Sequence, residues 1–80
     1  MRAVVTITRR REIADPEGAT IQRALADLGF GDVGAVRVNR TVELSMPGRD
    51  QEYVMSAVRA MCEKMLANPV MEDYEIEILD

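Results

Sequence analysis

Apolar residues recur along the chain with two spacings, one typical of strands and one typical of helices. Residues 3–8 are apolar and β-branched, which predicts a strand buried on at least one face. Residues 74–79 alternate between apolar and charged positions and predict a strand at the end of the chain. The inward-facing residues expected are Ala3, Val5 and Ile7 in the first segment, and Tyr74, Ile76 and Ile78 in the last.

Signals for the start of a helix follow the first strand. Asp15 can accept hydrogen bonds from free backbone amides, Pro16 suits the first helical position, and Gly29 suits the end of the helix. Apolar residues recur between these signals at the spacing of one helix face: Ile21, Ala24, Leu25 and Leu28. We therefore expect a helix from Pro16 to Leu28 with one apolar, buried face.

The second half of the chain repeats this order of patterns. Short alternating runs at 36–38 and 42–46 predict a hairpin whose turn is Asn39-Arg40-Thr41, closed by Pro47-Gly48. A longer apolar stripe predicts a helix from Asp50 or Gln51 to about Ala67. Asn68-Pro69 ends this helix, because a residue before proline is disfavoured in the helical region.

The predicted element order is β-α-β-β-α-β over a single domain, residues 1–80. Two right-handed β-α-β crossovers in one sheet give a ferredoxin-like α+β sandwich. We expect a four-stranded antiparallel sheet of order 4-1-3-2 with both helices on one face. The last strand then runs antiparallel to the first, which places Glu72-Asp73 close to Arg9-Arg10-Arg11.

Length and composition make self-association the expected source of extra stability. A chain of 80 residues and 8.9 kDa buries a small core. Its single cysteine cannot close a disulfide within the chain, and the absence of histidine leaves little for a zinc site. We therefore expect a homodimer or a higher homo-oligomer. The lone thiol and the lack of a signal peptide favour the cytoplasm, and no apolar run is long enough to span a membrane.

Charge and aromatic content argue against a nucleic-acid partner. The formal net charge is −4, and the chain has three aromatic residues, none of them in the two predicted central strands where RNA-recognition domains stack bases. The charges of Arg9, Arg10 and Arg11 are expected to be neutralised by nearby carboxylates. Cys62 lies close to an apolar stripe without a histidine to activate it, which favours a packing role. No catalytic constellation or phosphate-binding loop is present.

Three segments of the chain carry the motifs of one known family. Residues 13–18 match its V-L-D-P-x-G motif, with Ala14 in place of leucine. Residues 65–74 match L-L-A-N-P-V-I-E-D-Y, with Met71 in place of isoleucine and with Cys62 at the expected distance before it. Residues 36–43 match the family's hairpin, except that Asn39 and Arg40 replace glycine and lysine. Over essentially its whole length the chain therefore resembles the small PurS-type subunit of phosphoribosylformylglycinamidine synthase.

The resemblance implies a subunit without an active site of its own. In that family a large synthetase subunit binds formylglycinamide ribonucleotide and ATP with magnesium, and a glutaminase subunit releases ammonia from glutamine. The small subunit joins these two partners in purine biosynthesis and assists ammonia transfer. It binds no cofactor or metal. Motif or interface positions implied here are Asp15, Pro16, Gly18, Arg37, Asn39, Arg40, Asn68, Pro69, Val70, Glu72, Asp73 and Tyr74.

Other functions of the same predicted fold remain open from the residues alone. A small-ligand regulatory module would use Arg9 to Arg11 to grip a carboxylate or a phosphate. An acylphosphatase-like enzyme would need a phosphate-binding loop after the first strand, which the sequence lacks.

Overall fold

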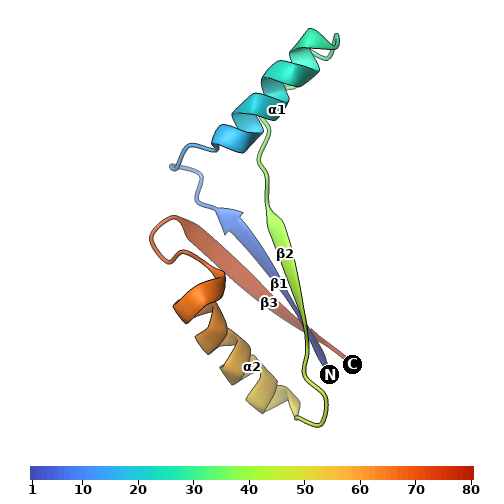
Figure 1. Cartoon of the computed structure of the whole chain (residues 1–80), viewed down its shortest axis with the longest axis vertical. Helices are drawn as coiled ribbons and strands as arrows, with labels where there is room; N and C mark the ends of the chain where they lie inside the picture. Colours follow the sequence, from blue (N-terminus) through green and yellow to red (C-terminus); the bar gives the residue numbers. More distant parts are fainter.

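The protein is described by a computed structural model of all 80 residues, with three strands, two α-helices and one short π-helix (Figure 1). In chain order the elements are β1 (Arg2–Arg9), α1 (Pro16–Asp27), β2 (Arg40–Ser45), α2 (Gln51–Met61), the π-helix η1 (Cys62–Leu66) and β3 (Glu72–Leu79).

The three strands form one antiparallel sheet in the order β2-β1-β3. Val5 in the centre of β1 lies opposite Val42 of β2 and Ile76 of β3, so the apolar sides of all three strands share one face. Ala3, Val5 and Ile7 are fully buried there. The predicted first and last strands and the inward-facing set of β1 are thus confirmed.

Helix α2 covers the apolar face of the sheet, mainly over β1 and β3, and completes the core. Val54 and Val58 of α2 and Cys62 at the start of η1 are fully buried and pack against the buried residues of β1. Asp50 caps the helix, as its carboxylate accepts a hydrogen bond of 2.8 Å from the amide of Tyr53. The last turn before Leu66 widens into η1, and Ala67 is already extended. Neither α1 nor α2 is long and apolar enough to cross a bilayer.

Helix α1 does not pack on the sheet, so the prediction that both helices cover one face is wrong for a single chain. Its local signals are as predicted: Asp15 caps its start and Gly29, with a φ of 100°, follows its end. The helix extends beyond the end of the sheet (Figure 1), and the molecule measures 50 × 26 × 14 Å. Its apolar face is consequently open, with Ile21 38% and Leu28 72% exposed.

The predicted hairpin is also wrong, and the sheet has three strands rather than four. Residues 35–39 belong to no strand. They lie beside the start of α1, whereas β2 begins at Arg40, a residue expected in the turn. The chain runs directly from this extended segment into β2, so nothing turns it back to form a fourth strand. The four-stranded ferredoxin-like sandwich is therefore not formed within one chain.

These two differences leave part of the apolar sheet face without a covering helix. Val42, Leu44 and Met46 on the β2 side pack against the core but stay only half-buried. In the predicted sandwich α1 would have covered them. The single chain thus has two uncovered apolar surfaces, one on α1 and one on the β2 side of the sheet.

Candidate functional site

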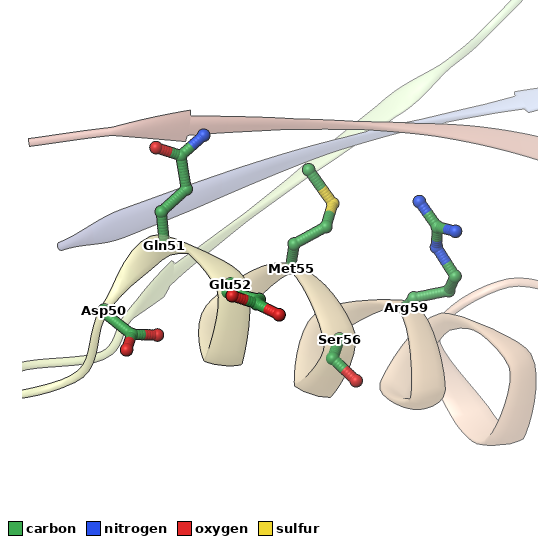
Figure 2. Close-up of a pocket in the computed structure, with 6 residues that line it drawn as sticks. All are labelled: Asp50, Gln51, Glu52, Met55, Ser56 and Arg59. Atoms are coloured by element: carbon green, nitrogen blue, oxygen red, sulfur yellow. The ribbon is translucent and has the colours of Figure 1, made fainter.

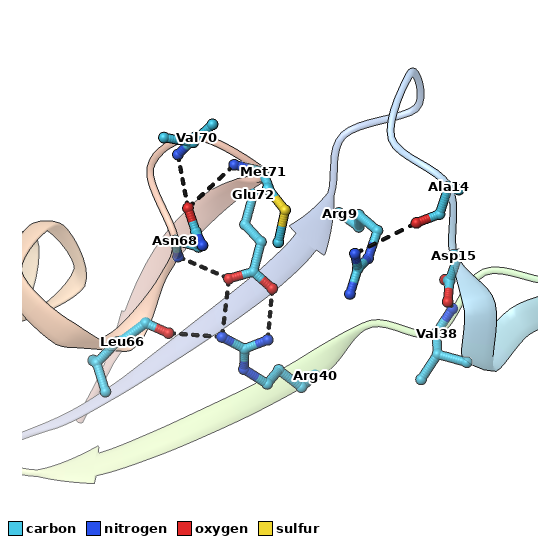
Figure 3. A network of polar contacts seen from close by, with 10 residues as sticks. All are labelled: Arg9, Ala14, Asp15, Val38, Arg40, Leu66, Asn68, Val70, Met71 and Glu72. Atoms are coloured by element: carbon cyan, nitrogen blue, oxygen red, sulfur yellow. Dashed lines mark hydrogen bonds and ion pairs between the residues drawn. The ribbon is translucent and has the colours of Figure 1, made fainter.

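Most of the candidate residues gather at one end of the sheet, where β1 ends and where β2, β3 and α1 begin (Figure 3). We call this region the polar end; the candidate residues whose side chains build it are Asp15, Arg37, Asn39, Arg40, Asn68, Glu72 and Asp73. Their proximity follows from the sheet register, in which Arg9 of β1 lies opposite Glu72 of β3.

An ion pair between Arg40 and Glu72 joins the two outer strands across β1. The guanidinium donates two hydrogen bonds to the carboxylate, of 2.7 and 3.0 Å, and a third of 2.8 Å to the carbonyl of Leu66 (Figure 3). The side chain of Glu72 is only 10% exposed. This bidentate geometry is the strongest form of an arginine–carboxylate contact. It holds the end of η1 and both outer strands in one arrangement.

The Asn68 side chain and the same carboxylate shape the turn between η1 and β3. Asn68 Oδ1 accepts hydrogen bonds from the amides of Val70, at 3.0 Å, and Met71, at 3.4 Å. The amide of Asn68 donates to Glu72 Oε1 at 2.8 Å. This is the side-chain-to-backbone bonding that makes asparagine favourable in turns. The turn presents Val70, which is 73% exposed, and Pro69 to solvent.

Asp15 links the start of α1 to the extended segment before β2. Its carboxylate accepts one hydrogen bond from the amide of Gly18 and another from the amide of Val38, both of 2.9 Å. The bond from Val38 is the larger cause, and that from Gly18 the next, of a pKa below the usual value for this carboxyl. Gly18 lies directly against the backbone of Val36.

Arg37 and Arg10 fix the loop between β1 and α1. Arg37 donates hydrogen bonds to the carbonyls of Arg10, at 2.8 Å, and of Arg9 and Ile13, at 3.3 Å each. Arg10 pairs with Asp73 at 3.2 Å and donates to the carbonyl of Pro69 at 3.0 Å. The expected neutralisation of the arginine run by β3 is thus confirmed for Arg10.

A small hollow of about 130 Å³ separates the start of α1 from the sheet. Four candidate residues line it, namely Asp15, Asn39, Arg40 and Glu72. Glu17 and Val38 also line it but were not candidate site residues, because their sequence patterns indicate only a helix start and an extended segment. Both Asp15 and Glu72 have lowered pKa values, which makes them weak proton acceptors at neutral pH. The polar end is therefore suited to holding elements in position rather than to acid–base chemistry.

Tyr74 is the one candidate side chain that points toward α2 and η1 instead. Its hydroxyl donates a hydrogen bond of 3.1 Å to Glu63 of η1. Burial, and then this carboxylate, raise the pKa of the tyrosine. Glu63 was missed in the sequence, because nothing in the spacing of residues 63 and 74 indicates that they meet.

A second, shallow hollow lies along α2, away from the polar end (Figure 2). Gln51, Met55 and Arg59 point toward β3, whereas Asp50 and Ser56 point away from the sheet. None of these residues was a candidate. Ser56 has no hydrogen-bonded base, so the hollow lacks the pair needed for nucleophilic catalysis.

The buried thiol of Cys62 is expected to react slowly. Burial, and then the nearby Glu63, raise its pKa, and the side chain is completely enclosed in the core. Labelling by a chromogenic disulfide reagent at pH 8 should be at least about 100-fold slower in the folded protein than in denaturant, because the core must open first. Cys62 is the only cysteine, so the denatured chain is the control. A labelling rate in the folded protein within tenfold of the rate in denaturant would contradict the burial of Cys62 in the core.

The Arg40–Glu72 pair is expected to make stability depend on pH. Hydrogen bonds from Arg40, and then from the amide of Asn68, lower the pKa of Glu72 below its usual value of 4.5. Its contribution is complete above that value and is lost as the pH falls through the folded-state pKa. Glu72→Gln should therefore lower the melting temperature by several degrees at pH 7, and the difference from wild type should shrink near pH 3.

Glu75→Gln is the matched control for this substitution, since Glu75 is exposed on the same strand and has no ion-pair partner. It should leave the melting temperature nearly unchanged at both pH values. If both substitutions changed the melting temperature equally at pH 7, the ion pair of Glu72 would make no specific contribution to stability.

Comparison with known proteins gives one consistent result. Residues 2–80 match the family model PurS, described as phosphoribosylformylglycinamidine (FGAM) synthase. The PurS subunit of that synthase from Methanocaldococcus jannaschii is 44% identical over 77 residues, which are 96% of this chain and 93% of the relative. The Bacillus subtilis subunit is 35% identical over 74 residues, which are 92% of this chain and 87% of the relative.

Solved structures agree with the sequence comparison. The crystal structure of M. jannaschii PurS, one of the subunits of formylglycinamide ribonucleotide amidotransferase in the purine biosynthetic pathway, is similar with a TM-score of 0.83. It is 43% identical, and the match covers 95% of this chain and 92% of that one. A chain of the PurLQS structure from Thermotoga maritima has a TM-score of 0.84 at 29% identity, over 98% of this chain and 95% of that one.

Proposed function

Because this chain belongs to the PurS family, the small subunits of FGAM synthase in purine biosynthesis, we propose that it bridges the glutaminase and ATP-dependent synthetase subunits and assists ammonia transfer between them. The chain is thus a subunit of a ligase complex. The observation that carries the proposal is the similarity over nearly the whole chain to a subunit of the PurLQS assembly.

The polar end supports a bridging role rather than a catalytic one. Its charged residues hold β1, β2, β3 and α1 in one arrangement, and they expose the Pro69-Val70 turn on the outside. A rigid, exposed turn suits contact with another subunit, because little order is lost on binding. In this proposal the partners bind glutamine and ATP with magnesium, and this chain binds no cofactor. The complex works in the cytoplasm.

We further infer that the chain works as a homodimer or a higher homo-oligomer. The apolar face of α1 is exposed, as are Leu28 and Phe30 just beyond its end, which are 72% and 55% accessible, and the β2 side of the sheet lacks a covering helix. Residues 35–39 are extended and have no strand partner. Unpaired extended backbone and open apolar faces favour association. A second copy can cover these surfaces and complete the two-helix layer of a ferredoxin-like sandwich.

The bridging proposal is tested by reconstituting the complex with and without this chain. Purified glutaminase and synthetase subunits, with glutamine, ATP, magnesium and formylglycinamide ribonucleotide, should form product efficiently only when this chain is added. A high concentration of an ammonium salt should bypass the requirement, because it supplies ammonia from solution. Equal glutamine-dependent rates with and without the chain would contradict the bridge. A requirement that persists with ammonium salt would contradict the role in ammonia transfer.

A further inference from the structure

Four arginines surround a second hollow at the polar end, on the side of the loop between β1 and α1. This hollow, of about 680 Å³, is lined by Arg9, Arg10, Arg11 and Arg37. Glu12 and Asp73 are the only acidic residues in its lining. The hollow is therefore locally positive in a chain whose formal net charge is −4. We call it the arginine hollow.

Internal contacts hold two of these guanidinium groups in place without using all their donors. Arg37 donates to three backbone carbonyls of the loop. Arg10 donates once to Asp73 and once to the carbonyl of Pro69. A guanidinium has five N–H donors, so both arginines keep donors for a ligand while their positions are fixed. The positive side of the hollow is thus organised before any ligand binds.

Other polar groups in the arginine hollow have no partner within the chain. The Arg11 guanidinium and the side chains of Thr8 and Asn39 make no hydrogen bond or ion pair. The backbone amides of Arg11 and Glu12 likewise donate to no group of the protein. Positive charge combined with free amide and hydroxyl donors matches the requirements of a tetrahedral oxyanion.

The lining also indicates which anion fits. Ala35 is the only apolar residue, and no aromatic residue is present to stack a base. The volume admits one small ligand rather than a peptide or a helix. We propose that the arginine hollow binds a phosphate group, either free or as the ester of a sugar phosphate or nucleotide, and that it recognises the phosphate rather than the base. The hollow borders the bridging turn, because Arg10 also donates to the carbonyl of Pro69, and it shares residues 35–39 with the surface proposed for a second copy. Phosphate binding is nevertheless not part of the proposed function.

The test is a titration of the full-length, isotope-labelled protein with inorganic phosphate, with ribose 5-phosphate and with ribose, followed by amide NMR and calorimetry. Both phosphates should shift the amide resonances of Arg11 and Glu12, and ribose should not. Tighter binding of ribose 5-phosphate would identify an ester as the ligand, whereas equal affinities would identify the phosphate group alone. Either result supports the site. No shift from either phosphate at millimolar concentration would overturn it.

A matched pair of variants locates the binding. Arg11→Ala should raise the dissociation constant about tenfold, as expected for the loss of one charge-assisted hydrogen-bonding group. Arg23→Ala removes the same charge from an exposed position of α1 outside the hollow and should leave the constant unchanged. Equal effects of the two variants would overturn the site, because binding would then depend on net charge. If Arg11→Ala bound phosphate as well as wild type but assembled less well with the partner subunits, the phosphate site would be overturned. The arginine hollow would then contact an acidic surface of a partner protein.

Discussion

Replacing Ile21 with aspartate is expected to turn the oligomer into a monomer. Ile21 lies on the apolar face of α1, is 38% exposed and is not part of the hydrophobic core, so the monomer should still fold. Full burial of an isoleucine side chain contributes about 1.5–3 kcal/mol, and the 38% of Ile21 that is still exposed accounts for about 0.6–1.1 kcal/mol of this. A two-fold symmetric interface contains the residue twice, and the aspartates would in addition bury two unpaired carboxylates. The dissociation constant should therefore rise by about 10²-fold or more.

Light scattering at micromolar concentration measures this effect directly. Wild-type protein should show at least twice the 8.9 kDa mass of one chain, and Ile21→Asp should show the single mass. Ala19→Asp is the matched control, because it adds the same charge on the opposite side of α1 at an exposed position. A wild-type monomer, or an Ile21→Asp oligomer of unchanged mass, would show that α1 is not part of an interface.

Comparing the predicted and observed α1 shows which of its features a single sequence can predict. Its boundaries were predictable because Asp15, Pro16 and Gly29 act through contacts with their own neighbours in the chain. Its apolar face was also predictable from the helical spacing of Ile21 and Leu28. The spacing does not indicate which surface covers that face, and the prediction of burial on the sheet was wrong for this reason.

The extended segment before β2 illustrates the same limit for strands. Alternation at Val36, Arg37 and Val38 correctly predicts extended backbone, but a strand also needs a partner that local pattern does not specify. In the predicted order the partner would have been the outer edge of β2, but residues 35–39 run directly into β2 without turning back and lie beside the start of α1 instead. The predicted hairpin therefore fails although the local conformation is close to the expected one.

The polar end was predictable in part. Antiparallel pairing of the first and last strands correctly placed Asp73 beside the arginine run, because that contact follows from register alone. The Arg40–Glu72 pair could not be predicted, because Arg40 was expected in a turn rather than in β2. A contact between two strands that are not neighbours depends on side-chain length and direction as well as on sheet order.

Gly18→Ala is expected to loosen α1 even though alanine is the better helix former. Alanine in the interior of a helix is more favourable than glycine by about 1 kcal/mol of helix-forming free energy. A Cβ at residue 18, however, would overlap the carbonyl oxygen of Val36 and lie 2.9 Å from its carbonyl carbon. Overpacking of this kind costs about 1–3 kcal/mol or more, and a backbone carbonyl cannot rotate away as a side chain can. The segment must shift, which also breaks the hydrogen bond from Val38 to Asp15.

Amide hydrogen exchange is the measurement that isolates this effect, because α1 contributes little to the core and a global melting temperature would move only slightly. Amides of α1 and of Val38 should exchange about tenfold faster in Gly18→Ala, equivalent to a net local loss of about 1.4 kcal/mol. Gly34→Ala is the control, since a Cβ there meets nothing within 4 Å and its backbone is not left-handed. If the amides of α1 exchanged as slowly in Gly18→Ala as in wild type, the glycine would matter only for the geometry of the helix. The close approach of α1 to the segment before β2 would then have no energetic consequence, and the Asp-Pro-x-Gly motif would need a different explanation.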